Sequence, residues 1–151
     1  MTPSFRFRLE RVRTVRADKE KAAQRELANA LTRRTSSVSE LRTAEDRVEH
    51  ARAAQRSAAA QPEALSGDEL RARQAFLERT EAQRRARERE LRQREAEVAA
   101  RGDELTTAAT EHEMLNRLRD RRRSEHDREA ARHESSALDE LATTRFSRSR
   151  A

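Results

Sequence analysis

Residues 61–68 read QPEALSGD and interrupt an otherwise long run of helix-forming residues. Pro62 lacks an amide hydrogen and disfavours helix at the residue before it. Ser66 followed by Glu69 fits a capping box, in which the serine side chain accepts a hydrogen bond from a first-turn amide and the glutamate reaches back to the serine amide. We therefore expect one helix to end just before this stretch and a second helix to begin near Gly67.

The composition of the chain favours long helices over a globular core. Of 151 residues, 41% are charged, 34% are hydrophobic and 3% are aromatic, whereas an ordinary domain is about 25% charged and about 45–50% apolar. High charge with low hydrophobicity is also the signature of disorder. Because the chain is rich in Ala, Arg, Glu and Leu, which are good helix formers, a coiled coil explains the composition better. The absence of Cys excludes disulfides, thiolate metal sites and a cysteine nucleophile.

These features predict an all-α fold, an elongated antiparallel two-helix coiled coil that forms a single hairpin over residues 1–151. The first helix is expected at residues 5–60, the turn at 61–66, the second helix at 67–145 and a frayed tail at 146–151. After its first residue the second helix contains one Gly and no Pro, and the first helix contains neither.

Large apolar residues recur at every seventh position, as in a coiled-coil seam. In the second helix one column reads Leu70, Leu77, Arg84, Leu91, Val98, Leu105 and His112. In the first helix two columns read Leu31, Val38, Glu45 and Arg52, and Leu27, Arg34, Leu41, Val48 and Gln55. Antiparallel pairing of residues whose numbers sum to 129 sets Arg34 opposite Glu95. It also sets Glu45 opposite Arg84. The predicted seam comprises Leu27, Leu31, Val38, Leu41, Val48, Leu70, Leu77, Leu91, Val98 and Leu105.

The sequence offers no catalytic, cofactor or metal site. His126 and His133 are seven residues apart on one helix, whereas two ligands of one metal ion are expected three or four residues apart. Two Gly are too few for a phosphate-binding loop, and a two-helix rod has no concave pocket that would assemble catalytic side chains. We therefore expect a protein that is not an enzyme and that uses no cofactor and no metal.

Both ends of the chain are basic, and a hairpin is expected to bring them together. Residues 1–16 carry five Arg against Glu10 alone, and the segment from Thr143 carries three Arg and no acidic residue. Three of the four Phe lie in the same two segments. Together they predict a positive, apolar tip that docks on an acidic or pocketed partner.

Other interpretations of the surface are open from the residues alone. A nucleic-acid partner would use the Arg residues, but acidic residues are interspersed and stacking aromatics are missing. The N-terminal residues could form a helix on a membrane surface, and the second helix could dimerise in parallel as a structural rod. No apolar run approaches the ~20 residues of a membrane-spanning helix, and no apolar region of a secretory signal is present. The expected compartment is the cytoplasm.

Two terminal motifs resemble those of the flagellar export protein FliJ family. The first is FRFRLERV at residues 5–12, followed by Arg16, Glu20 and the run from Ala22 to Leu27. The second comprises residues 128–134, then LDELA at 138–142 and Arg145-Phe146. The resemblance covers the whole chain. It implies an antiparallel two-helix coiled coil of the type III flagellar export apparatus, similar in shape to the central stalk of rotary ATPases.

The resemblance also implies partners. FliJ-like proteins dock their terminal helices into the hexameric export ATPase and stimulate it, contact the export gate membrane protein, and handle escort chaperones, with no direct nucleic-acid contact expected. Such a protein is cytoplasmic and peripheral at the cytoplasmic face of the inner membrane. The implied ATPase-docking end comprises Phe5, Phe7, Leu9, Val12, Arg16, Leu138, Leu141, Arg145 and Phe146. The implied gate-facing half comprises Leu41, Val48, Phe76 and Leu77.

Overall fold

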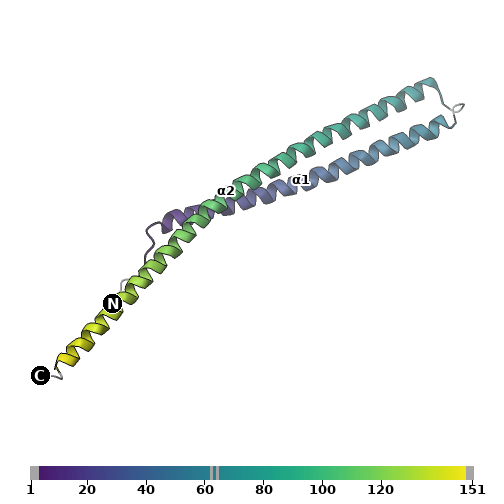
Figure 1. Ribbon diagram of the computed structural model, residues 1–151. Helices are drawn as coiled ribbons and strands as arrows, with labels where there is room; N and C mark the ends of the chain where they lie inside the picture. Colours follow the sequence, from purple (N-terminus) through teal and green to yellow (C-terminus); the bar gives the residue numbers. More distant parts are fainter. Residues whose placement is uncertain (1–3, 62, 64, 149–151) are drawn as a thin grey trace. The chain divides into compact units, whose positions relative to one another are not determined.

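Two long helices form the protein, and the all-α hairpin expected from the sequence is confirmed (Figure 1). The computed structural model describes residues 4–61, 63 and 65–148. Helix α1 comprises Glu10–Ala59 and helix α2 comprises Gly67–Arg148, with no strand among the described residues.

The chain divides into two compact units. We call residues 22–105, which include the turn, the loop unit. Residues 1–21 and 106–151 form the terminal unit, of which residues 4–21 and 106–148 are described. Each unit contains part of α1 and part of α2.

The break between the helices has the predicted cap. The amide of Ser66 donates to Glu69 Oε2 at 2.9 Å, and the amide of Glu69 donates to Ser66 Oγ at 3.3 Å. These reciprocal bonds satisfy amides that have no partner within the helix. At the end of α1 the amide of Ala60 donates to the Arg56 carbonyl at 3.2 Å, and the chain leaves the helix after Ala59.

The outer helix boundaries differ from the sequence-based expectation. Helix α1 begins at Glu10, five residues later than expected, and residues 4–7 are not helical. Helix α2 continues to Arg148, because no Gly or Pro is present near residue 145 to end it. Of the tail expected at 146–151, residues 146–148 are helical, and residues 149–151 lie outside the described residues.

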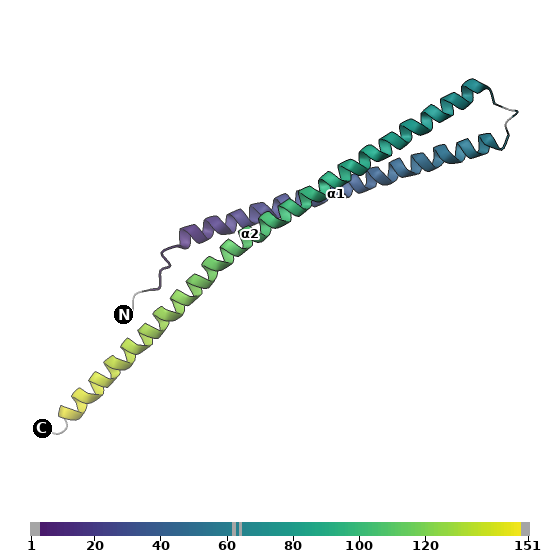
Figure 2. The ribbon, with the colours of Figure 1, turned by 45° about the horizontal axis from the view of Figure 1, so that its top comes forward.

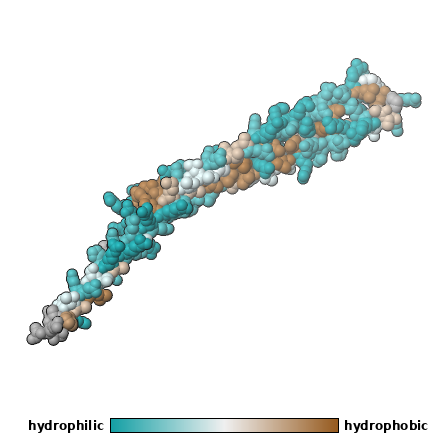
Figure 3. All heavy atoms as spheres, in the orientation of Figure 1, coloured by the Kyte–Doolittle hydropathy of each residue, from teal (hydrophilic) through white to brown (hydrophobic). Residues whose placement is uncertain are grey.

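In the loop unit, α1 and α2 run antiparallel and side by side in both ribbon views (Figures 1 and 2). The residues that α1 buries recur at every seventh position and are small: Ala30, Ser37, Ala44, Ala51 and Ala58. Val48 of α1 and Thr80 of α2 are also buried, at 3% and 5% exposed. Small side chains at the contact let two helices approach closely. Figure 3 shows the hydrophobic residues of this unit as a narrow, interrupted band between hydrophilic surfaces.

One column of the predicted seam is displaced by one residue. Leu31 and Val38 are 43% and 39% exposed, whereas the preceding residues, Ala30 and Ser37, are buried. Leu70 of α2 is 48% exposed. Ala is weakly hydrophobic, so a heptad pattern of large apolar residues indicates the neighbouring column and not the column that is buried. The other residues assigned to the seam are buried or half-buried: Leu27, Leu41, Val48, Leu77, Leu91, Val98 and Leu105.

Ion pairs across the helices define the register of the loop unit. The pair expected between Arg34 and Glu95 is present, with Nη2 and Oε1 3.6 Å apart. Arg84, expected opposite Glu45, instead forms an ion pair at 3.5 Å with Glu88 of its own helix. Further pairs across the helices are Arg33–Glu97 at 2.5 Å, Glu40–Arg87 at 2.7 Å and Arg52–Glu81 at 3.0 Å.

In the terminal unit, α2 extends past the start of α1. Ala108, 2% exposed, is the one buried residue among the described side chains of this unit. From residue 131 to residue 146 every side chain is exposed. Figures 1 and 2 both show this yellow end of α2 with no other described element beside it. We call residues 131–146 the solitary helix.

Candidate docking surfaces

The N-terminal segment, residues 4–9, packs on α2 without forming a helix. Phe5 and Phe7 are half-buried, whereas Arg6 and Arg8 are exposed. Residues two apart point to the same side in an extended chain, but about 200° apart in an α-helix. Both Phe rings can therefore pack on α2 only if this segment is extended. For this reason α1 begins at Glu10 and not at residue 5.

The two Phe side chains line an open groove of about 860 Å³ on the terminal unit. The ring of Phe5 lies 5.6 Å from the ring of His126, with the planes tilted by 58°. Helix α2 contributes Leu118, Arg122, Glu125, His126 and Glu129 to the lining. The groove thus combines apolar rings with charged side chains of both signs.

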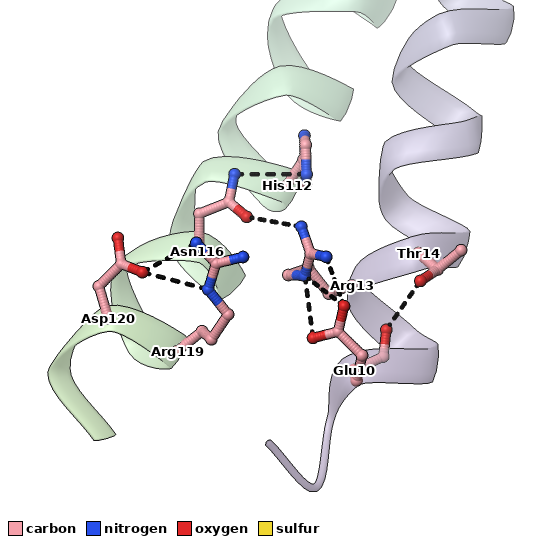
Figure 4. A network of polar contacts seen from close by, with 7 residues as sticks. All are labelled: Glu10, Arg13, Thr14, His112, Asn116, Arg119 and Asp120. Atoms are coloured by element: carbon pink, nitrogen blue, oxygen red, sulfur yellow. Dashed lines mark hydrogen bonds and ion pairs between the residues drawn. The ribbon is translucent and has the colours of Figure 1, made fainter. Parts of the chain in front are cut away.

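The first turn of α1 is held by an ion pair within the helix (Figure 4). Arg13 Nε donates to both carboxylate oxygens of Glu10, at 3.1 Å each. These bonds hold the pKa of Glu10 below its usual range and raise the pKa of Arg13. Thr14 Oγ1 donates to the carbonyl of Glu10 at 3.0 Å. A negative charge at this position also suits the positive end of the helix dipole.

Polar side chains connect α1 to α2 in the terminal unit. Arg16 Nη1 lies 2.5 Å from Glu111 Oε2, and Lys19 Nζ lies 3.5 Å from the same oxygen. Glu20 Oε2 lies 2.6 Å from His112 Nδ1. Arg16, one of the residues implied to dock on a partner, therefore already has an ion-pair partner within the protein.

The nine residues implied for the docking end form two groups in the structure. Phe5, Phe7, Leu9, Val12 and Arg16 belong to the N-terminal segment and the start of α1, and Leu138, Leu141, Arg145 and Phe146 belong to the solitary helix. Phe5 contacts α2 at His126, twenty residues before Phe146 and so about 30 Å away along the helix. The two ends therefore provide two separate surfaces and not the single tip expected from the sequence.

The solitary helix has one apolar side. Leu138, Leu141 and Phe146 are 66%, 61% and 65% exposed. At 100° per residue, their directions fall within about 140° of one another, and Arg145 lies between them. Exposed apolar residues that gather on one side of a helix mark a surface for a partner.

A second groove, of about 650 Å³, lies on the loop unit beside Phe76. Its apolar lining is Ala51, Ala54, Ala72 and Phe76, and its polar lining is Thr43, Asp46, Arg47, His50, Glu69 and Arg73. Phe76 is 52% exposed, whereas Val48 is buried between the helices. Leu41 and Leu77 are half-buried. Of the four residues implied to face the gate, Phe76 is thus the one that offers a large apolar surface to solvent.

Two features of these surfaces were missed from the sequence. The extended N-terminal segment has a signal, since Phe5-Arg6-Phe7-Arg8 alternates apolar and charged residues with the period of an extended chain. No sequence pattern indicates that His112 contacts Glu20, because this contact depends on the register of α1 against α2. His112 continues the heptad column that begins at Leu70, and its side chain is 20% exposed.

Metal sites and membrane-spanning helices are both absent from the described residues. No group of three or more His, Cys, Asp or Glu in that part of the chain could hold a metal ion. None of the helices, over the residues described, has a stretch long and apolar enough to span a bilayer.

The sequence matches a model of a protein family over residues 5–151, nearly the whole chain, and that family is described as "Flagellar FliJ protein". The match includes the N-terminal segment, both helices and the solitary helix. No curated protein and no solved structure matches the sequence.

Proposed function

The chain belongs to the FliJ family of flagellar proteins, and we propose that it binds and stimulates the hexameric export ATPase. As a member of this family it is a component of the flagellar export apparatus. In the proposal it acts as a stalk-like coiled coil that also links the ATPase to the export gate membrane protein and meets escort chaperones. It would act in the cytoplasm, at the cytoplasmic face of the inner membrane.

One observation carries the proposal: the apolar side of the solitary helix is largely exposed to solvent. Leu138, Leu141 and Phe146 are each more than three-fifths exposed. Covering such side chains would contribute about 25 cal/mol for each Å² of apolar surface removed from water. A pocket on the ATPase that accepts one helix side, with an acidic group near Arg145, is the complementary surface.

The N-terminal segment provides the second part of the proposed docking end. Leu9 and Val12 are 40% and 44% exposed, next to the partly covered rings of Phe5 and Phe7. The described residues 4–21 carry seven Lys or Arg against three Asp or Glu, which favours an acidic partner.

The test is ATP turnover by the export ATPase of the same organism, measured with and without this protein. The triple substitution L138A/L141A/F146A should abolish stimulation while leaving helicity intact, because Ala is the best helix former and all three side chains are largely exposed. The substitution F5A/L9A/V12A tests the second group in the same assay, and a weaker loss is expected because Phe5 is already partly covered.

Met114→Ala is the matched control, because Met114 is 66% exposed on α2 but lies outside the proposed surface. It should leave stimulation unchanged. Stimulation of the ATPase by L138A/L141A/F146A at the wild-type level would overturn the assignment of the solitary helix.

We assign the contact with the export gate to the groove beside Phe76. Its lining contributes an exposed ring and three Ala side chains flanked by charges. Phe76→Ala should weaken capture by the cytoplasmic part of the gate protein and leave ATPase stimulation unchanged. If the gate protein captures wild type and Phe76→Ala equally well, the gate contact lies elsewhere.

A nucleic-acid-associated rod is the second candidate, because the N-terminal 4–21 stretch has an excess of basic residues. Binding to random duplex, with an affinity that falls steeply as salt rises, would favour it. A parallel dimer that pairs α2 with α2 would favour a purely structural rod. Neither result is expected if the ATPase is stimulated through the solitary helix.

A further inference from the structure

The exposed side of the solitary helix carries a short heptad pattern. Glu134, Leu138, Leu141 and Arg145 follow one another at intervals of four, three and four residues, which is the spacing of contact positions in a coiled coil. Leu138 and Leu141 are 66% and 61% exposed, and Glu134 and Arg145 are exposed as well. These four side chains, which we call the terminal seam, are therefore apolar in the middle, acidic at one end and basic at the other.

The terminal seam is complementary to its own reversed copy. The described helix α2 ends at Arg148. When two copies pair antiparallel over this stretch, the first residue of each solitary helix lies level with Arg148 of the other copy, and facing residue numbers sum to 279. Leu138 then faces Leu141, Glu134 faces Arg145, and each contact occurs twice about a two-fold axis. Because the ends of the stretch set this alignment, the meeting of opposite charges is an independent observation.

A parallel pairing of the same helices lacks this complementarity. In a parallel dimer Glu134 would face Glu134 and Arg145 would face Arg145, and like charges across a contact repel each other. The antiparallel alignment also keeps the contact within the solitary helix, because earlier residues of α2 lie level with positions beyond the described helix of the other copy. The part of α2 that holds Phe5 at His126 therefore stays outside the contact.

We propose that the solitary helix binds the solitary helix of a second copy of this chain in an antiparallel arrangement. The pairing removes Leu138 and Leu141 of both copies from water and places each Arg145 beside a carboxylate of Glu134. Because few large apolar side chains are covered, the dimer is weak and forms reversibly.

Self-pairing would cover the surface that we assign to the export ATPase, and this step rests on the proposed function. Glu134 of the second copy takes the place of the acidic group that Arg145 would meet on the ATPase. The monomer is then the form that docks, and the ATPase and the second copy compete for the terminal seam. The dimer itself depends on no other partner.

Sedimentation velocity over a range of protein concentrations tests the dimer on the full chain. E134R and R145E should each raise the dissociation constant about tenfold, because two exposed attractive pairs become repulsive. The double variant E134R/R145E exchanges the charges and should recover the wild-type dimer. Such a recovery distinguishes a contact between the two positions from damage to the helix.

Two further variants bound the contact. Leu138→Ala should raise the dissociation constant about a hundredfold, because each dimer loses two buried Leu side chains. Glu140→Arg makes the same charge change as E134R at an exposed position outside the terminal seam, so it should dimerise as wild type does. Circular dichroism of each variant checks that the helices are intact.

The orientation of the dimer is measured with single spin labels, because the chain contains no Cys. Ser124→Cys and Ser136→Cys are exposed positions of α2. In the antiparallel dimer the two labels at 124 lie about 46 Å apart along the axis, and the two labels at 136 lie about 10 Å apart along it. Electron resonance should therefore give a much longer distance for Ser124→Cys. Similar distances for both positions would indicate a parallel dimer and overturn the proposal.

The remaining outcomes separate the dimer from the proposed function. A wild-type protein that stays monomeric at every concentration, or a double variant as weak as the single ones, would overturn the dimer. E134R should stimulate the ATPase at lower protein concentrations than Glu140→Arg does, since more of it is monomeric. Identical curves for these two variants would overturn the competition and leave the dimer standing. Absence of stimulation by wild type would overturn the proposed function, which sedimentation does not involve.

Discussion

The loop unit and the terminal unit join the same two helices by different chemistry. In the loop unit the ion pairs across the helices are backed by a buried column of small residues: Ala30, Ser37, Ala44, Ala51 and Ala58. In the described part of the terminal unit, Ala108 alone is buried, and the contact is made by ion pairs, hydrogen bonds and the half-buried rings of Phe5 and Phe7. Apolar burial depends little on direction or salt, whereas polar contacts depend on geometry, ionic strength and protonation.

This difference assigns separate tasks to the two units. A buried column of small residues fixes one close approach of the helices, which suits a part that must stay paired. Half-exposed ion pairs such as Arg16–Glu111 contribute about 0–1 kcal/mol each, so a partner can replace them at little cost. The proposed docking end lies in the unit whose contacts are easier to exchange.

The largest expected effect comes from placing a charge in the small-residue column. Ala30 is 0% exposed, and Ala30→Asp would bury a short carboxylate that cannot reach water. We expect a loss of about 3 kcal/mol in the free energy of unfolding, measured by urea denaturation followed by circular dichroism. Ala28→Asp, on the exposed side of the same helix turn, carries the same propensity cost of roughly 0.6 kcal/mol without the burial. Equal losses for both variants would show that the column is not the stabilising contact.

The fold could be predicted from the sequence because its signals are local. Pro62 and the Ser66–Glu69 cap identify the break, and the long runs without Gly or Pro predict the helices. Of the two ion pairs expected from pairing residues whose numbers sum to 129, Arg34–Glu95 is present at 3.6 Å, whereas Arg84 pairs with Glu88 and not with Glu45. Long helices joined by a short turn leave few alternatives for pairing.

The rest could not be predicted because it depends on how the two helices meet. Ala30 is buried and Leu31 is 43% exposed, although Leu is the more hydrophobic residue. A close approach of the two helices leaves room only for the small side chain of Ala30, whereas hydrophobicity alone would place Leu31 at the contact. In the same way, Phe5 packs on α2 far from Phe146 for two reasons. The N-terminal segment is extended, and α2 continues beyond the start of α1.

Added salt should affect hydrogen exchange in the two units differently, and this effect is smaller than that of Ala30→Asp. The Debye length falls from about 10 Å at 0.1 M to about 3 Å at 1 M ionic strength, which screens exposed ion pairs. Adding sodium chloride should therefore speed amide hydrogen exchange more at residues 10–21 of the terminal unit than at residues 30–58 of the loop unit, where the buried column remains when the ion pairs are screened. Glu111→Gln removes the partner of Arg16 and Lys19 and should reduce the salt response. A response of equal size in both units would contradict the contrast between polar and apolar pairing.

The smallest expected effect is an acid response of the loop unit through Glu97. Hydrogen bonds from Arg33 at 2.5 Å and from Arg94 at 3.3 Å hold the pKa of Glu97 below its usual range. A lowered pKa in the folded state adds stability above the unfolded value, about 4.3, and this stability is lost as the pH falls through the folded value. The stability difference between wild type and Glu97→Gln, measured by urea denaturation, should therefore be constant near neutral pH and shrink below about pH 4. The stability difference between wild type and Glu97→Gln should be small, because the Arg33 side chain is 40% exposed and solvent weakens its ion pair with Glu97. A stability difference that already shrinks between about pH 5 and about pH 8 would contradict the assignment to Glu97, because a carboxylate with a lowered pKa stays ionised in that range.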